Sequence, residues 1–449
     1  MKESKKAIWG WAVYDWANSA FVCTVMAVFF PIFFKQYWSA GVDVNMSTAQ
    51  LGLGNSLASL AVALMAPILG AIADKGSARK RFLIFFAYLG VLATAALFLV
   101  TKGQWALAIL AYSAGVIGFS GANVFYDALL PTVADEDRID SISCLGYSLG
   151  YLGGGLLLAV NVYMTMKPAL FGLADAGQAV RWSFLSVALW WGLFTVLTIL
   201  WVPEAKTAAA AKAGESPVTA GFRQFIATFK KIRNLKTVFL FLLAYWLYID
   251  GVDTIIRMAV DYGMSIGFKS NDLVLALLIT QFVGFPSALI FGRLGKWWGV
   301  RKSIFLAIGI YIGVSFWGVM ISNQMEFYVL AVVVGLVQGG IQALSRSYYS
   351  RLIPLDQAGE FYGFYNMMGK FAAIIGPALM ALSGLVARRL LMPPSPTPEI
   401  IESVGRLASR WSIGSVAILF VAGGLIFFFV DEEEGRREIK ALESDSERS

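Results

Sequence analysis

Apolar runs of about twenty residues recur along the whole chain, and short segments rich in charge separate them. A run of this length crosses the hydrocarbon core of a bilayer as a helix, in which every backbone hydrogen bond is satisfied internally. Only 14% of the residues are charged, whereas a soluble domain carries roughly a quarter. The pattern predicts an all-α membrane protein with twelve transmembrane helices.

The predicted spans fall into two sets of six, with a longer polar stretch between the sets. We expect an N-terminal six-helix bundle over residues 1–202 and a C-terminal six-helix bundle over residues 237–430. The segment 203–236 is the predicted cytoplasmic linker, and apolar residues at helical spacing in its second part indicate an amphipathic helix on the membrane surface. The charged tail, 431–449, has few large apolar residues, so we expect it to be disordered.

A short internal repeat relates the two halves. A glycine and, a few residues further on, an Arg-Lys pair follow the second apolar run, and the same pattern returns after the eighth. Because six spans separate the copies, both run in the same direction across the membrane. Two parallel six-helix bundles resemble the major facilitator fold, in which the bundles alternate access to a central site.

The first copy of the repeat also carries an acid, Asp74, just before the basic residues that begin the third span. A carboxylate at a helix end that faces fixed cations makes a breakable latch between bundles. In the second copy, Lys296 stands in the place of the acid. The alternative is that the basic residues only reflect the positive-inside bias. The predicted gating loops contain Gly70, Asp74, Arg79, Lys80, Arg81, Gly292, Arg301 and Lys302.

Ionisable side chains inside the spans are the strongest functional signal, because placing one in hydrocarbon costs about 2.5–3.5 kcal/mol. Polar residues at helical spacing form one stripe on each of the first, fourth, seventh and tenth spans. In the superfamily that the repeat resembles, these four spans line the central cavity. With two residues of span eleven, the predicted substrate or proton cavity contains Asp15, Asn18, Asn123, Tyr126, Asp127, Asp250, Asp253, Arg257, Gln338, Gln342, Arg346, Asn366 and Lys370.

Each stripe also has an interpretation that needs no substrate. Asp253 and Arg257 have the i,i+4 spacing of an ion pair and could only neutralise each other. Asp127 lies close to the inner end of its span, where it is an equally good gate partner for Arg79. Hydrogen bonds from a neighbouring helix could hold Asp15 in place.

The absence of histidine from the chain narrows the possible chemistry. It removes the imidazole proton relay and every metal site that uses histidine, so we expect no metal and no cofactor. Proton coupling would have to run through carboxylates, and Asp15 and Asp250 are the first candidates. Arg346 and Lys370 suit a substrate carboxylate, although an internal pair between Arg346 and either Asp15 or Asp127 is an equally good interpretation.

Five strings resemble one branch of the superfamily, the autophagy-related vacuolar effluxer-like group, also called the unidentified major facilitator family. They are WAVYDWANSAF at 11–21, FYDALLP at 125–131, GYSLGYLGG at 146–154, QALSRS at 342–347 and GEFYGFYN at 359–366. The resemblance covers nearly the whole chain and implies twelve spans, alternating access and the export of small solutes. Fungal relatives move amino acids out of the vacuole, which makes amino acids the substrate class that the resemblance implies. Asp127 departs from the family pattern, in which asparagine is more usual.

We therefore predict a secondary active transporter of a small organic solute, with amino-acid efflux as the specific hypothesis. One alternative is a broad-specificity exporter of drugs or metabolites, although the fifth span lacks the Gly-Pro pair typical of proton-coupled drug exporters. Alternatives of another class are a transporter-like sensor and a membrane-embedded enzyme. The chain offers no positioned base and nucleophile, so we expect no catalytic residues and no enzymatic activity.

The expected partners follow from the charge distribution. Most of the 36 Lys and Arg residues lie in the segments that share a side with both termini, which predicts a multi-pass protein of the cytoplasmic (inner) membrane with both termini in the cytoplasm. Because this bias explains the net charge of +7, no nucleic-acid partner is expected. The predicted partners are a small-molecule substrate and membrane lipid, with protons as the candidate coupling ion, and we expect a monomer.

Overall fold

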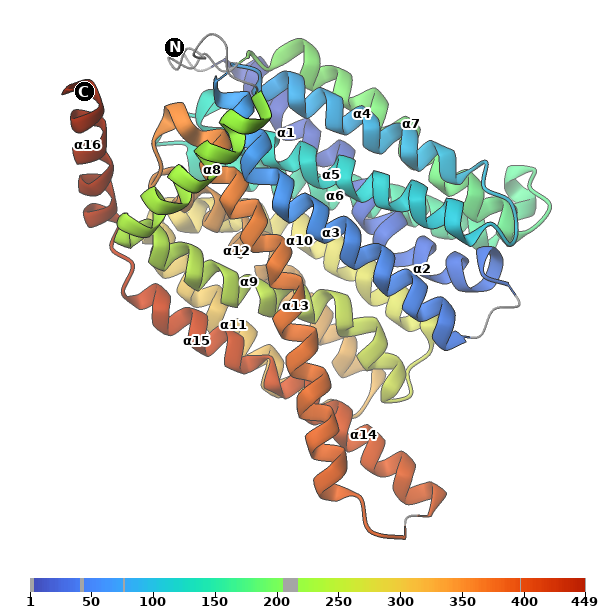
Figure 1. Ribbon diagram of the computed structural model, residues 1–449. Helices are drawn as coiled ribbons and strands as arrows, with labels where there is room; N and C mark the ends of the chain where they lie inside the picture. The colour runs from blue at the N-terminus through green and yellow to red at the C-terminus, as the bar shows by residue number, and fades with distance from the viewer. Residues whose placement is uncertain (1–3, 41–43, 76, 205–216, 396, 449) are drawn as a thin grey trace. The chain divides into compact units, whose positions relative to one another are not determined.

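The computed structural model describes residues 4–40, 44–75, 77–204, 217–395 and 397–448, and every element of secondary structure in these ranges is a helix (Figure 1). The longer helices are α1 (Lys5–Ala20), α3 (Val44–Lys75), α4 (Arg79–Leu97), α5 (Trp105–Val133), α6 (Ile139–Met166), α7 (Ala176–Trp201), α8 (Pro217–Asn234), α9 (Lys236–Ser265), α10 (Ser270–Trp298), α11 (Val300–Met320), α12 (Gln324–Ser350), α13 (Ala358–Leu391), α14 (Pro398–Ser415), α15 (Ala417–Phe428) and α16 (Glu432–Arg448). The short elements are η1 (Phe21–Phe29), α2 (Phe30–Phe33), η2 (Phe34–Trp38), η3 (Pro168–Phe171) and η4 (Leu355–Gln357).

Eleven helical segments among the described residues are long and apolar enough to cross a membrane. The first of them is continuous over Lys5–Trp38, and α14 and α15 together form the last, Pro398–Phe428. Helix α3 adds a shorter apolar stretch, Leu60–Asp74, within its 32 residues. These segments match the twelve predicted spans in order along the chain.

Large apolar side chains stay exposed on the outer faces of these helices. Leu92, Leu110 and Leu193 are each at least 68% exposed, and they lie on α4, α5 and α7. A soluble protein rarely leaves so much apolar surface uncovered. Lipid tails solvate such faces, so the exposure agrees with a membrane-embedded chain.

The chain forms two compact units. The first unit is Met1–Lys231 with Ile353–Met367, and the second is Ile232–Leu352 with Met368–Ser449. In the first unit α4 packs against both α5 and α7, and α1 packs against α6 and α7. In the second unit α10 packs against α12, and α9 packs against α15. Helix α13 contributes its first residues to the first unit and its remainder to the second.

The linker is helical where the structure describes it. Helix α8, Pro217–Asn234, lies in the second part of the linker, where the spacing of apolar residues predicted a helix. Its location on a membrane surface stays a prediction. Residues 205–216 of the predicted linker lie outside the described residues.

The structure differs from the predicted disordered tail, because helix α16 covers Glu432–Arg448. Three glutamates occupy its first turn, where their negative charges interact favourably with the positive end of the helix dipole and stabilise the helix. Arg436 pairs with Glu432 across one turn at 2.9 Å. The backbone N–H of Thr237 donates to Glu438 at 3.2 Å, which ties α16 to the start of α9. Low hydrophobicity therefore did not prevent order here, since local ion pairs and a docking contact compensate for it.

Candidate functional site

The polar stripes of α1 and α5 meet inside the first unit. Asp15 is 9% exposed and accepts a hydrogen bond from the hydroxyl of Tyr126 at 2.8 Å. The indole of Trp11 donates to the backbone carbonyl of Tyr126 and stacks on its ring at 4.3 Å, which fixes the position of the hydroxyl. One turn along, the amide of Asn18 donates to Asn123 at 2.7 Å. The structure thus brings four of the predicted cavity residues together.

Glycines of α6 make room for this cluster. A Cβ atom at Gly146 would lie 2.6 Å from the Tyr126 hydroxyl and 3.0 Å from an oxygen of Asp15. A Cβ atom at Gly150 would lie 2.6 Å from the hydroxyl of Ser19. Any larger residue would have to displace the neighbouring polar groups, so the small residues of span five let α1 and α6 come close.

The second unit holds a buried acid on its first helix as well. Asp250 of α9 is fully buried and accepts hydrogen bonds from the backbone N–H groups of Gly376 at 2.9 Å and Ile375 at 3.1 Å. The hydroxyl of Thr254 donates to it at 3.2 Å. Pro377 follows directly in α13, where its ring removes a backbone donor. Asp250 therefore binds the backbone of α13 at a Gly-Pro step.

Asp15 and Asp250 occupy matching places in the two halves. Each lies four residues after a tryptophan on the first helix of its half, at Trp11 and Trp246. The sequence analysis missed this correspondence, although the shared W-x-x-x-D spacing was the available signal. Each acid also contacts a glycine-bearing helix of its own half, α6 for Asp15 and α13 for Asp250.

The other charges of α9 are more exposed. Arg257 lies 3.8 Å from Asp253, and their side chains are 48% and 24% exposed. The i,i+4 pair is thus present but long and partly open to solvent, which makes it weak. Lys370 of α13 lies close enough to Asp253 to interact with it electrostatically.

The polar stripe of α12 is mostly buried. Arg346 is 1% exposed, Gln338 is 7% exposed and Gln342 is half-buried. The hydroxyls of Tyr248 and Ser345 are 2.7 Å apart and link α12 to α9. The side-chain oxygen of Gln338 is buried without a hydrogen-bond partner.

The predicted latch residues Asp74 and Arg79 form an ion pair at 2.6 Å, and both are 2% exposed. Asp74 also accepts hydrogen bonds from the backbone N–H groups of Gly359 at 3.1 Å and Glu360 at 2.9 Å. These groups lie in the first turn of α13, where a helix presents unpaired donors and a positive dipole end. The acid therefore binds a helix N-terminus as well as a cation.

Arg79 extends the latch to the turn that precedes α13. Its guanidinium donates to the carbonyl groups of Leu355 at 3.2 Å and Asp356 at 3.0 Å. It also reaches the carbonyl of Ala128, near the end of α5, at 3.5 Å. Further along α13, the side-chain amide of Asn366 donates a hydrogen bond to the carboxylate of Asp127 at 2.9 Å. The latch thus joins α3, α4 and α5 to the first turns of α13.

Small residues allow this close contact between α3 and α13. A Cβ atom at Gly70 would lie 2.1 Å from the carbonyl oxygen of Gly359. A Cβ atom at Gly363 would lie 2.5 Å from the Cα atom of Pro67. The glycine that opens the repeat is therefore a contact point of the latch.

The remaining basic residues of the first gating loop have another role. Lys80 is half-buried and Arg81 is exposed, and their backbone N–H groups donate to the carboxylate of Glu204 at 2.8 and 3.3 Å. Glu204 thereby satisfies free donors at the start of α4, as a capping residue does. It follows the sixth span, and no sequence pattern connected it to this loop.

The second gating loop makes different contacts. Arg301 donates to the carbonyl of Phe428 and lies 5.9 Å from the centre of that ring. Gly292 is buried, whereas Lys302 is exposed. Lys296, which replaces the acid of the first copy, is also exposed. The repeat therefore preserves the position of the basic hairpin but not the acid-centred latch.

Helix α8 contacts the same segment as the latch. The hydroxyl of Thr228 donates to the buried carboxylate of Glu360, and Lys231 donates to Gln357 at 2.7 Å. The sequence analysis did not single out Glu360, whose only signal was its place in the string at 359–366. The linker helix is thus attached to the start of α13.

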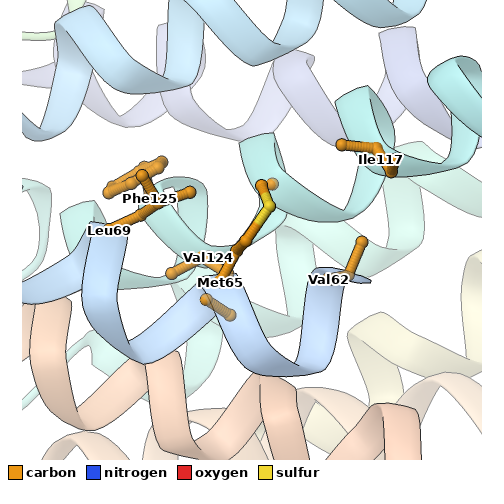
Figure 2. Close-up of a pocket in the computed structure, with 8 residues that line it drawn as sticks. Val62, Met65, Leu69, Ile117, Val124 and Phe125 are labelled. Carbon is orange, nitrogen blue, oxygen red and sulfur yellow. The ribbon is translucent and has the colours of Figure 1, made fainter. Parts of the chain in front are cut away.

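A small crevice between α3 and α5 is lined only by apolar groups (Figure 2). Met65 and Leu69 of α3 face Val124 and Phe125 of α5 there. With no polar group to orient a ligand, it is a packing gap between two spans.

Twelve apolar helical segments, with a buried acid on the first helix of each half, have the make-up of a transporter of the major facilitator superfamily. Two solved structures support the fold. The human organic anion transporter MFSD10 (TETRAN) aligns with a TM-score of 0.68 at 13% identity over 94% of this chain and 99% of that one. The proton:xylose symporter XylE aligns with a TM-score of 0.66 at 16% identity over 97% of both chains.

Within that superfamily, the chain belongs to the family described as "Vacuole effluxer Atg22 like", which matches residues 3–51 and 40–383. It is 38% identical over 435 residues to the "Uncharacterized MFS-type transporter YxiO" of Bacillus subtilis, covering 96% of both chains. It is 23% identical over 460 residues to "Autophagy-related protein 22" of Yarrowia lipolytica, covering 83% of this chain and 74% of the relative. The resemblance expected from the sequence strings is confirmed.

Proposed function

We propose that this transporter exports a small organic solute, with amino acids as the substrate class, and couples transport to protons through Asp15 and Asp250. The direction is supported by the family description, which names a vacuole effluxer. The solute class is supported by the family resemblance, and the coupling by the buried acids. The proposal concerns transport alone, without enzymatic activity.

The observation that supports proton coupling is that each half of the chain buries one carboxylate on its first helix, Asp15 and Asp250. Asp15 is held by a tyrosine hydroxyl, and Asp250 by two backbone N–H groups and a threonine hydroxyl. A carboxylate in this setting gains or loses a proton when its surroundings change, because hydration and neighbouring donors determine which form is favoured. Rearrangement of α1 against α6, or of α9 against α13, would supply that change.

The latch supports alternating access. If both termini are cytoplasmic, as the positive-inside bias favours, Asp74 and Arg79 lie at the cytoplasmic ends of their helices. The latch then closes that side by holding the first turns of α13 against α3. Opening requires Asp74 to release two backbone N–H groups, so the latch is a discrete switch between two states.

The test is counterflow of labelled leucine and phenylalanine into liposomes that contain the purified protein, with and without an imposed pH gradient. We expect uptake that follows the gradient in the native chain. The Asp15→Asn and Asp250→Asn variants should keep exchange but lose the response to the gradient. Glu402→Gln is the matched control, because this carboxylate is largely exposed on α14 and should leave coupling intact.

Three outcomes would contradict the proposal in different ways. Absence of flux for a panel of amino acids would exclude the substrate class. Flux that ignores the pH gradient in the native chain would exclude proton coupling. A gradient response that persists in both asparagine variants would exclude these two acids as its carriers.

A further inference from the structure

Helix α8 has one buried face, which attaches it to the start of α13. The hydroxyl of Thr228 donates to the carboxylate of Glu360, and these side chains are 2% and 3% exposed. Three residues along α8, Lys231 donates to Gln357 at 2.7 Å. Glu360 also supplies one of the backbone N–H groups that bind Asp74. Helix α8 therefore holds the same turn of α13 that closes the latch.

The opposite face of α8 is exposed and mixes large apolar side chains with basic ones. Ile226 is 42% exposed and Phe229 is 51% exposed. Lys230 and Arg233 are exposed as well. Ile226, Lys230 and Arg233 follow one another at i, i+4 and i+7, so they form one stripe along the helix. In total α8 contains four basic residues and no acidic one.

A bilayer surface is the partner that fits this face. Leu235 alone separates the end of α8 from α9, whose first residues begin an apolar segment long enough to cross a membrane. This connection through one residue keeps α8 next to the point where that segment enters the bilayer. At that level, apolar side chains insert between the acyl chains, while lysine and arginine side chains extend to the phosphate groups.

We propose that the exposed face of α8 binds the headgroups of anionic phospholipids. The charge of the helix selects the class of lipid, because basic residues without a neighbouring acid are attracted to a surface of net negative charge. A zwitterionic headgroup offers the same phosphate together with its own cation, so its attraction to α8 is weaker. The proposal concerns a lipid surface, and it depends neither on the transported solute nor on proton coupling.

Lipid binding at this face has a consequence for the latch. A helix that lipid holds on one face and Glu360 holds on the other links the bilayer to the first turn of α13. Movement of that turn away from α3 then breaks the hydrogen bond from Thr228 or displaces α8 from the lipid. A ligand favours the state in which it is bound more tightly, so anionic lipid favours the closed latch.

The test is hydrogen exchange of the full-length protein in lipid nanodiscs, measured by mass spectrometry. One set of nanodiscs contains dioleoylphosphatidylcholine alone. In the other set, about a quarter of this lipid is replaced by dioleoylphosphatidylglycerol, which has the same acyl chains and a net negative charge. We expect peptides that cover residues 223–234 to exchange about 3- to 10-fold more slowly in the anionic nanodiscs. Peptides that cover residues 355–365 should also exchange more slowly there.

Two double variants assign the effect to α8. Lys230→Gln with Arg233→Gln removes two exposed cations of the stripe, so the ratio of exchange rates between the two nanodiscs should be at most half that of the native chain. Arg437→Gln with Lys440→Gln is the matched control. It removes the same charge from exposed positions of α16, and residues 223–234 should respond to anionic lipid as in the native chain.

Three results would overturn the proposal. The first is equal exchange of residues 223–234 in the two nanodiscs, and the second is a native ratio in the variant that lacks Lys230 and Arg233. The third is equal protection of these peptides by inorganic phosphate added to phosphatidylcholine nanodiscs, which would assign the face to a free anion. Unchanged exchange of residues 355–365, with α8 protected, would refute the effect on the latch.

Discussion

Replacing Gly70 by alanine should open the latch. The new Cβ atom would lie 2.1 Å from the carbonyl oxygen and 2.6 Å from the carbonyl carbon of Gly359. A normal contact needs more than 3 Å, so the first turn of α13 must move away from α3 by about 1 Å. The hydrogen bonds from Gly359 and Glu360 to Asp74, now 3.1 and 2.9 Å long, would then exceed bonding distance.

The magnitude follows from these bonds. A hydrogen bond to a charged acceptor contributes about 1.5–3 kcal/mol net, so losing even one favours the open latch by roughly 10- to 100-fold. Hydrogen exchange measured by mass spectrometry reports the opening of the latch directly, because the two N–H groups that bind Asp74 are themselves exchangeable. We expect peptides that cover residues 355–365 to exchange faster by that factor in Gly70→Ala.

Gly309→Ala is the matched control. Gly309 lies within α11, and a Cβ atom there would meet nothing within 4 Å. It reports the general gain in helix propensity on replacing glycine by alanine, about 1 kcal/mol, without a steric clash. Unchanged exchange over residues 355–365 in Gly70→Ala, or an equal change in Gly309→Ala, would refute the argument.

Two further predictions concern the buried acids. Gly376→Ala places a Cβ atom 1.8 Å from the hydroxyl of Thr254 and 2.7 Å from Asp250. We therefore expect the free energy of unfolding, measured by thermal denaturation, to fall by about 1–3 kcal/mol in this variant and not in Gly309→Ala. Tyr126→Phe removes the hydroxyl that donates to Asp15, which should cost about 1.5–3 kcal/mol. In an Asp15→Ala background, which lacks the acceptor, the same Tyr126→Phe change should cost much less, and an equal cost in both backgrounds would contradict a direct bond.

Much of the fold could be predicted because bilayer crossing leaves a strong local signal. Length and hydropathy predicted the twelve spans, and helical spacing predicted which face of α1 and α5 is polar. The contact of Asn18 with Asn123 then follows from two stripes on neighbouring helices. Charge patterning could also predict the pair between Asp74 and Arg79, since these residues lie at the two helix ends that flank one short loop.

The partners that sequence reasoning missed are backbone groups far away in the chain. Asp74 accepts hydrogen bonds from the backbone N–H groups of Gly359 and Glu360, and the identity of these two side chains does not indicate that their backbone binds an acid. Every residue except proline offers the same donor, so no side-chain pattern could identify them. The expectation of a disordered tail differs from the structure for a related reason. Composition predicts how much apolar surface a segment can bury, but it does not predict a docking contact such as that between Thr237 and Glu438.

Two backbone N–H groups of α13 hold the carboxylate of Asp250 in place. A backbone N–H group remains when one side chain is exchanged for another. Residue 375 can vary in chemistry without removing the N–H group that holds the carboxylate, whereas a side chain at 376 would meet Thr254 and Asp250. Only proline would eliminate a donor, and proline already occupies the next position. The donor at 375 therefore survives a change of side chain, so the surroundings of the acid on that side can vary while the acid stays in place.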